Sequence, residues 1–301
     1  KGKFMVSIRY MKMSMDQNYI DSQEVSDEKI LQLPNPYGMP KNFSVVPQDM
    51  DMDMIMLGGM YAPTDRITLM SMATFNAKSM NLRTYRPMMN RNALGNFSTK
   101  SSDLSILNLS ALLKIYDRDN SKFHAQIGVE KNIGKNDVSS QVLMPTGNIG
   151  SIVMPYSMQG GDKSLSLLGA ITYTKSFGVW KVGGQIRTKT NIKNKEWNFG
   201  DSDELNIWSQ RDLNNISAWS LRVKVQDIKP IDGTDKNIRA PVQTADPRNY
   251  GGITVSLGIG LNILLPRGSI GLETYKPISR DLNGPQMGMD WALQAGYRLS
   301  F

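Results

Sequence analysis

Residues 50–60 read MDMDMIMLGGM, with methionine at every even position except Gly58. Because successive side chains of a β-strand point to opposite faces, a spacing of two predicts a strand. One face then carries thioethers, while the other face changes from aspartate to apolar residues toward Tyr61. An α-helix repeats every 3.6 residues and would scatter these methionines around its axis.

Stretches with the same alternation recur along the whole chain, about twelve in all and each about ten residues long. In each stretch one face is continuously apolar, and the other carries small polar, amide or charged residues. A tilted strand of about 9–11 residues is long enough to cross a bilayer. We expect strands within residues 4–15, 50–61, 66–75, 104–116, 123–130, 165–173, 180–186, 204–208, 218–225, 253–265, 269–275 and 289–301.

The connections between these strands alternate between short and long. The short ones lie near residues 62–65, 117–121, 177–179, 212–215 and 266–268, and the long ones near 16–48, 82–100, 135–162, 192–202, 231–250 and 278–288. Twelve antiparallel strands need eleven connections, so five turns fall on one side and six loops on the other. Short periplasmic turns and long extracellular loops are typical of outer-membrane barrels.

The sequence therefore predicts an all-β fold: one antiparallel up-and-down barrel of twelve strands, comprising residues 1–301, in the outer membrane of a Gram-negative bacterium. Both termini are expected in the periplasm. Fourteen strands remain an alternative if loop 16–48 or loop 135–162 contains a hairpin, and a secreted or soluble all-β domain is a further one. Tyr297, Leu299 and Phe301 alternate up to a terminal aromatic residue, which resembles the signal that barrel-assembly machinery reads.

Composition narrows the function classes. The chain has no cysteine and one histidine, which excludes disulfides and cysteine–zinc sites and leaves little material for a catalytic triad, so we expect no enzyme activity. Its 35 basic and 27 acidic residues are scattered, without a nucleic-acid recognition motif. We expect contact with outer-membrane lipid and lipopolysaccharide, a surface for a protein partner on the long extracellular loops, and no nucleic acid.

If the apolar faces meet lipid, the methionines point into the lumen. The inward set on three consecutive strands is Met11, Met13, Met15, Met50, Met52, Met54, Met56, Met60, Met70 and Met72. A tight turn at 62–66 would place Met56 opposite Met72 and Gly58 opposite Met70. Inward positions on the other strands form a mainly cationic polar wall, with Lys114, His124, Glu130, Arg187, Arg222, Lys224 and Arg298.

Three uses of the methionine face remain open. Methionine fills irregular space, and the face could pack against loop 16–48, which contains Ile30, Leu31, Leu33, Pro34, Pro36 and Tyr37. Thioether sulfur is also a soft, neutral ligand that selects Cu(I), and by extension Ag(I), so these methionines are candidate metal ligands although no cofactor is required. A slot for an aromatic or other apolar solute is the third use.

Two functions follow from these uses. The first is a transporter or channel for a small solute or a soft metal ion along the methionine-lined wall. The second is a structural or partner-associated barrel with a plugged, methionine-packed lumen that transports nothing.

The chain also resembles a known family at residues 8–15 (IRYMKMSM), 50–72 (MDMDMIMLGGMYAPTDRITLMSM), 153–161 (VMPYSMQGG) and 281–301 (DLNGPQMGMDWALQAGYRLSF). The family comprises methionine-rich outer-membrane proteins regarded as transporters and is related to the MetA-pathway barrels of phenol degradation. Some relatives carry the name α-amylase, which nothing in these residues supports. The resemblance implies an outer-membrane barrel with a role in transport and names no substrate.

Overall fold

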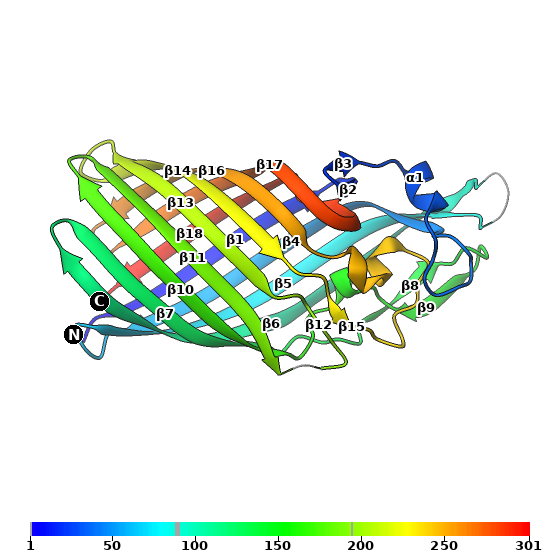
Figure 1. Ribbon diagram of the computed structural model, residues 1–301, viewed down its shortest axis with the longest axis horizontal. Coiled ribbons are helices and arrows are strands. Elements are labelled where there is room, and N and C mark those ends of the chain that lie inside the picture. Colours follow the sequence, from blue (N-terminus) through cyan, green and yellow to red (C-terminus); the bar gives the residue numbers. More distant parts are fainter. Residues whose placement is uncertain (1, 88–90, 194) are drawn as a thin grey trace.

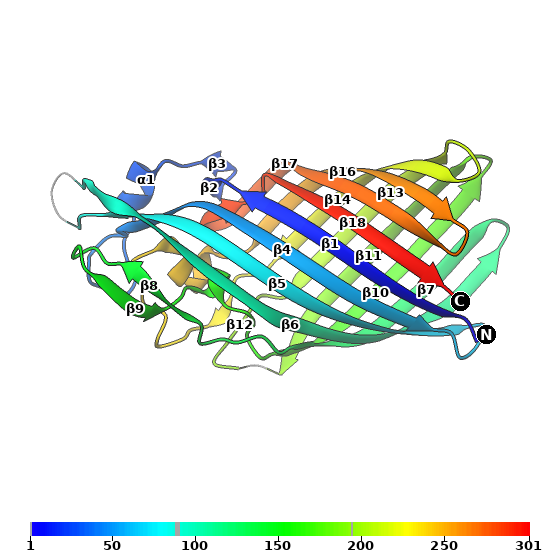
Figure 2. The same cartoon turned by 180° about the vertical axis from the view of Figure 1, so that it is seen from behind.

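A computed structural model describes residues 2–87, 91–193 and 195–301, and these residues form a closed antiparallel barrel (Figures 1 and 2). The main sheet has fourteen strands; β16 pairs with β17 and closes the ring, which leaves β2 and β3 outside it. Twelve strands therefore make the barrel, as predicted. They are β1 (Phe4–Met15), β4 (Val45–Tyr61), β5 (Ile67–Tyr85), β6 (Ala93–Arg118), β7 (Ser121–Asn132), β10 (Leu165–Phe177), β11 (Trp180–Lys193), β13 (Ser202–Asp212), β14 (Ser217–Ile228), β16 (Gly252–Leu265), β17 (Gly268–Gly288) and β18 (Trp291–Ser300).

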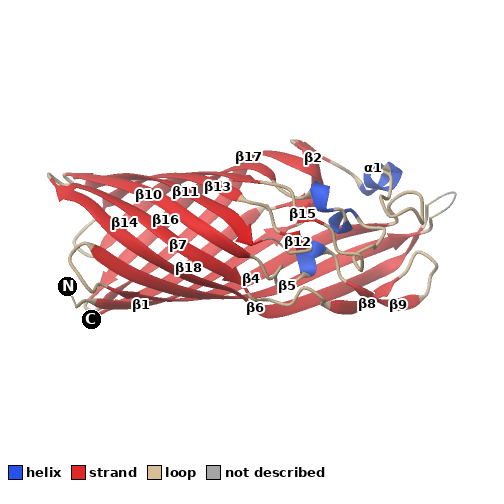
Figure 3. Cartoon of the chain, turned by 60° about the horizontal axis from the view of Figure 1, so that its bottom comes forward, coloured by secondary structure: helices blue, strands red, loops and turns tan. Residues whose placement is uncertain are grey.

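The remaining elements lie in the long connections at the end of the barrel away from the termini (Figure 3). None of the helices in the described residues has the length and apolarity to cross a membrane. These elements are β2 (Gln17–Asp21), β3 (Gln23–Glu24), α1 (Asp27–Gln32), β8 (Ser139–Leu143), β9 (Ile149–Val153), η1 (Tyr156–Met158), β12 (Trp197–Asn198), β15 (Asp232–Gly233), η2 (Gln243–Ala245) and η3 (Pro247–Asn249).

The observed connections differ from the predicted ones in two places. All five short turns lie where we expected them, at the end that carries both termini. Residues 82–100 and 278–288, however, belong mostly to strands: β5 and β6 leave a connection of only residues 86–92, and β17 continues to Gly288. Their outer faces carry polar residues such as Arg83 and Asn96, so the apolar alternation on which the prediction relied is missing.

The outer face of the barrel is apolar over the height of a membrane. Leu109 is 62% exposed, Ile127 57% and Leu57 55%, exposures that are unfavourable in water and expected against lipid. Toward the extracellular end this face becomes polar, where the Tyr10 hydroxyl donates a hydrogen bond to Asp53. The barrel fold and this apolar band are those of proteins in the outer membrane of Gram-negative bacteria.

Several strands are much longer than a membrane requires. β4 has 17 residues, β5 19, β6 26 and β17 21, whereas about 9–11 suffice to span a bilayer. The additional residues continue beyond the apolar band as a curved extracellular wall (Figures 1 and 3). This wall supports the loops that fold back over the lumen.

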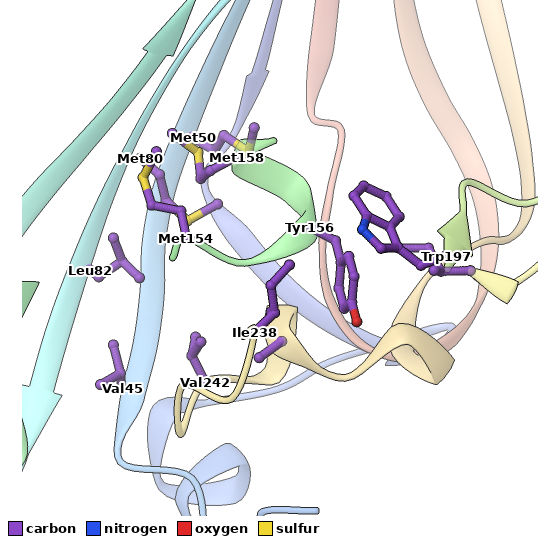
Figure 4. Close-up of a cluster of buried hydrophobic side chains, with 12 residues drawn as sticks. Val45, Met50, Met80, Leu82, Met154, Tyr156, Met158, Trp197, Ile238 and Val242 are labelled. Atoms are coloured by element: carbon purple, nitrogen blue, oxygen red, sulfur yellow. The ribbon is translucent and has the colours of Figure 1, made fainter. Parts of the chain in front are cut away.

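Two long loops, residues 133–164 and 229–251, meet above the lumen, and we call them the plug. Their buried residues Met154, Tyr156, Met158, Ile238 and Val242 form one core with inward residues of the wall (Figure 4). Each of these five side chains is at most 2% exposed. The extracellular end of the lumen is thus filled by packed apolar side chains.

The packing alternative is correct for only a small part of its loop. The structure places Ile30 and Leu31 in a separate cluster with Phe43 and Val46, against which Leu33 packs, whereas Tyr37 packs against the core that contains Met50 and Met80. Loop 16–48 carries its own short helix, α1, and its β2 continues the sheet beyond β17. Most of its apolar residues therefore pack within the loop, and the buried methionines Met50 and Met80 are covered mainly by the plug. The hairpin β8–β9 in loop 133–164 forms a separate sheet and adds no strand to the barrel.

Candidate functional site

Methionines face one another across β1 and β4. The register places Met15 opposite Met50, Met13 opposite Met52, Met11 opposite Met54 and Met5 opposite Met60. Directly opposite residues on one face of a sheet have Cβ atoms about 4.5–5.5 Å apart, so the side chains of each pair are neighbours. We call this surface, with its continuation on β5, the methionine wall.

The register between β4 and β5 differs from the prediction by two residues. Met72 lies opposite Gly58, and Met56 lies opposite Thr74, whereas Met60 pairs with Met70. The reason is at the turn, where each arm bonds to its other neighbour. The amide of Ala62 donates a hydrogen bond to the carbonyl of Lys3 on one side, and the carbonyl of Arg66 accepts one from the amide of Lys114 on the other. Residues 62–68 therefore do not pair with one another across the turn. A shift of two keeps every side chain on its predicted face.

Three polar residues interrupt the methionine wall on β5. Thr74 lies opposite Met56, Asn76 opposite Met54 and Lys78 opposite Met52. The Lys78 ammonium donates hydrogen bonds of 2.8 Å to the carbonyls of Ser157 and Gln159 in the plug. Lys78 was not among the predicted site residues, although the alternation that runs from Met72 to Met80 places it on the inward face.

The predicted polar residues lie on the other strands of the barrel, with Lys114 on β6 and Arg298 on β18 directly beside the methionine wall, and several form ion pairs. Glu130 is 3.4 Å from Lys189, and Lys224 is 3.2 Å from Glu204. Lys114 lies opposite His124 near the periplasmic end, Arg187 lies opposite Glu204, and Arg298 lies opposite Ser7 and Ser269. Whether they contact a solute stays a prediction.

A charged and aromatic cluster occupies the middle of this polar wall. The Arg222 guanidinium donates to Glu273 at 2.7 Å and to Asn206 at 2.9 Å, and it lies 5.3 Å from the ring centre of Trp208. The Tyr275 hydroxyl donates to the other oxygen of Glu273. Sequence analysis selected Arg222 but not Trp208, whose inward position follows from its alternation with Ile207.

Two chambers follow one another along the methionine wall. The periplasmic chamber has a volume of about 450 Å³ and is lined by Met5, Met60, Met70 and Met72 on one side and by Arg222 and Arg298 on the other. The extracellular chamber has a volume of about 530 Å³ and lies beneath the plug. Met11, Met54 and Met56 line neither chamber and lie between them on β1 and β4.

The extracellular chamber combines methionines and cations. Seven methionines line it, Met13, Met15, Met50, Met52, Met80, Met287 and Met289, and so do four cations, Lys78, Lys189, Lys229 and Arg280. No aspartate or glutamate of the described residues lines it. Met287 and Met289 come from the far end of β17 and its turn, so sequence analysis of the N-terminal strands could not assign them to this place.

A metal site of the usual hard or borderline ligands is missing from the part of the chain described. There, no three His, Asp or Glu side chains gather so that they could hold an ion. A metal in this lumen would need thioether ligands, and binding of Cu(I) or Ag(I) by the ten predicted methionines stays a prediction.

Known structures show the same fold. No protein-family model and no curated protein sequence matches the chain. An outer-membrane channel from Pseudomonas putida F1 superposes with a TM-score of 0.58 at 16% identity, over 100% of this chain and 96% of that one. The P. putida toluene transporter TodX gives a TM-score of 0.48 at 10% identity, over 100% of this chain and 90% of that one. The likeness to the first shows that the chain has the fold of an outer-membrane barrel, and it identifies no substrate.

Proposed function

We propose that the chain is an outer-membrane channel for small solutes, which pass along the methionine wall and whose entry is controlled by the plug. The observation that carries the proposal is the pair of chambers, about 530 and 450 Å³, that follow one another along a single wall through the barrel. Binding cavities for small molecules usually measure about 300–1,000 Å³. Each chamber is therefore large enough to hold a small solute.

A matched pair of tryptophan substitutions tests this function. Met72→Trp places a large side chain in the periplasmic chamber, whereas Leu109→Trp places the same side chain against lipid beside it, because Leu109 lies opposite Ser71, the residue before Met72. We expect Met72→Trp to lower solute entry into proteoliposomes at least about twofold and Leu109→Trp to leave it unchanged, because only the lumen is narrowed. If the parent protein admits no solute and carries no current in planar bilayers, the structural or partner-associated barrel is the correct alternative.

A soft metal ion is the second candidate for the same path. Its support is the register, which places Met11 opposite Met54 and Met13 opposite Met52, so that four thioethers lie within two adjacent pairs. Replacing these four by leucine conserves volume and should preserve the barrel. Loss of Ag(I) uptake in this variant would support the ion, and unchanged uptake would overturn it. The uncompensated cations beneath the plug oppose a cationic solute, and we therefore place the organic solute first.

A further inference from the structure

The extracellular chamber carries an excess of positive charge that the fold leaves without partners. Of its four cations, Lys189 pairs with Glu130 at 3.4 Å and Lys229 with Asp227 at 2.7 Å. Lys78 donates only to backbone carbonyls among its described partners. Like Lys78, Arg280 forms no ion pair with a carboxylate in the described structure.

Arg280 is held in place while one nitrogen of its guanidinium lacks a hydrogen-bond acceptor. The guanidinium lies 4.1 Å from the ring centre of Tyr19, and its Nη2 donates to the carbonyl of Met289 at 3.0 Å. Its Nη1 is buried and has no hydrogen-bond partner in the described structure. Gly288 permits this placement, because a Cβ there would lie 2.8 Å from Nη1.

The surroundings of Arg280 leave its Nη1 without an acceptor. Asp290 is close enough to Arg280 for a charge interaction, but the described structure has no ion pair between them, and Asp290 Oδ2 accepts a hydrogen bond from the amide nitrogen of Asp16 at 2.6 Å. Thr244 also lines the chamber, and its buried hydroxyl likewise has no partner in the described structure. A buried charged donor without an acceptor is costly, so an anionic group that fills this place gains charge-assisted hydrogen bonds.

The other side of the chamber is apolar except for Lys78, whose ammonium is bonded to the plug. Met13, Met15, Met50 and Met52 form adjacent cross-strand pairs on it, and methionine adapts to ligands of varied shape. A ligand that matches both sides has an apolar body and an anionic head. From the charge, the unpartnered donors and the methionines together, we propose that the chamber binds amphipathic organic acids, with the carboxylate at Arg280 and the apolar body along the methionine wall. This names the solute class of the proposed channel and therefore rests on that function for its biological meaning.

Equilibrium binding tests the inference separately from transport. The probe is 4-phenylbutyrate, compared with its neutral amide, titrated calorimetrically into the full chain in lipid nanodiscs. We expect the acid to bind at least about tenfold more tightly than the amide, since charge-assisted hydrogen bonds exceed neutral ones. Equal affinity of acid and amide, or no binding of either, overturns the inference.

Three substitutions divide the chamber into its two sides. Arg280→Gln should weaken the acid about tenfold and leave the amide unchanged, and Arg280→Lys should keep part of the preference for the acid. Met52→Gln should weaken both probes alike, because it makes the apolar side polar. Lys122→Gln removes a charge outside both chambers and should change neither. If Arg280→Gln and Lys122→Gln weaken the acid equally, the chamber attracts anions only through overall charge and the assigned site is wrong.

Binding and flux fail in distinguishable ways. If the acid binds at Arg280 but no solute crosses the barrel, the binding site stands and the channel function is wrong. If solutes cross but acid and amide bind equally, the channel stands and the assigned solute class is wrong.

Discussion

Methionines of the same wall lie in two different surroundings. Met50 and Met80 are 5% and 1% exposed and lie against Met154 and Met158 of the plug, as Figure 4 shows. Farther from the plug, on β1 and β4, Met11, Met13, Met52 and Met54 are only partly buried and face the lumen. The difference is whether another segment covers them. Methionine is therefore buried in a packed core at the plug end of the wall and partly exposed to the lumen farther along it.

The largest expected effect concerns the covered end. Tyr156 is fully buried, its ring lies 4.8 Å from that of Trp197, and its hydroxyl accepts from the amide of Asp235. Tyr156→Ala leaves a cavity that we expect to cost the plug about 3–5 kcal/mol, while the barrel, which has its own hydrogen-bond ladder, stays folded. Limited proteolysis within residues 133–164 should become faster, and conductance should rise.

Met54→Ala is the control for this change, since it removes an apolar side chain from the uncovered part of the wall. It should leave the proteolysis of loop 133–164 unchanged. If both substitutions accelerate proteolysis of the loop equally, the covered and uncovered ends of the wall do not differ in their effect on the plug, and the proposed difference between them is wrong.

The next effect concerns the link between wall and plug. Lys78→Met removes two hydrogen bonds from an ammonium to carbonyls, each 2.8 Å long, and leaves the carbonyls of Ser157 and Gln159 without this donor. Hydrogen bonds to charged groups contribute about 1.5–3 kcal/mol. Hydrogen exchange of the amides in residues 154–159 should accelerate more than tenfold. Lys181→Met, on the distant strand β11, should leave the exchange of these amides unaltered. If these amides exchange as slowly in Lys78→Met as in the parent protein, the hydrogen bonds of Lys78 do not hold the plug to the wall.

The smallest effect concerns the rim of the extracellular chamber. Burial, with a further contribution from Asp16, raises the pKa of Asp290 to about 6, compared with about 3.9 in an unfolded chain. Between these values the folded protein holds more protons than the unfolded chain, so stability falls as pH rises through this window and is level above it. We expect a change below about 1 kcal/mol, because the carboxyl is partly exposed and solvent screens it.

Asp290→Asn should flatten the stability profile between pH 4 and pH 6, measured by thermal unfolding in detergent. A decrease in stability as pH falls through this window in the parent would reverse the expected sign. Tyr156→Ala serves as the control, because its effect on stability should not depend on pH in this range.

Alternation along the sequence was sufficient to predict much of the architecture. A period of two assigns each residue to a face from its immediate neighbours, so the twelve strands, the five turns and the inward side of the methionines followed from local pattern. The prediction failed where a strand has no lipid-facing apolar row, as at residues 82–100 and 278–288. There the strand extends beyond the membrane, and its outer face carries no hydrophobic signal.

Tertiary structure alone decided which segments meet. Met56 faces Thr74 instead of Met72 because the arms of the turn pair with β1 and β6, and this choice depends on the whole ring. The plug comes from loops 133–164 and 229–251 and not from loop 16–48, because long-range packing selects among loops of similar composition. The chamber beneath it combines Met13 with Met289 and Lys78 with Arg280, residues that are more than 200 positions apart. Period and composition are local properties of a chain, whereas closure of the barrel and burial of the loops bring distant residues together.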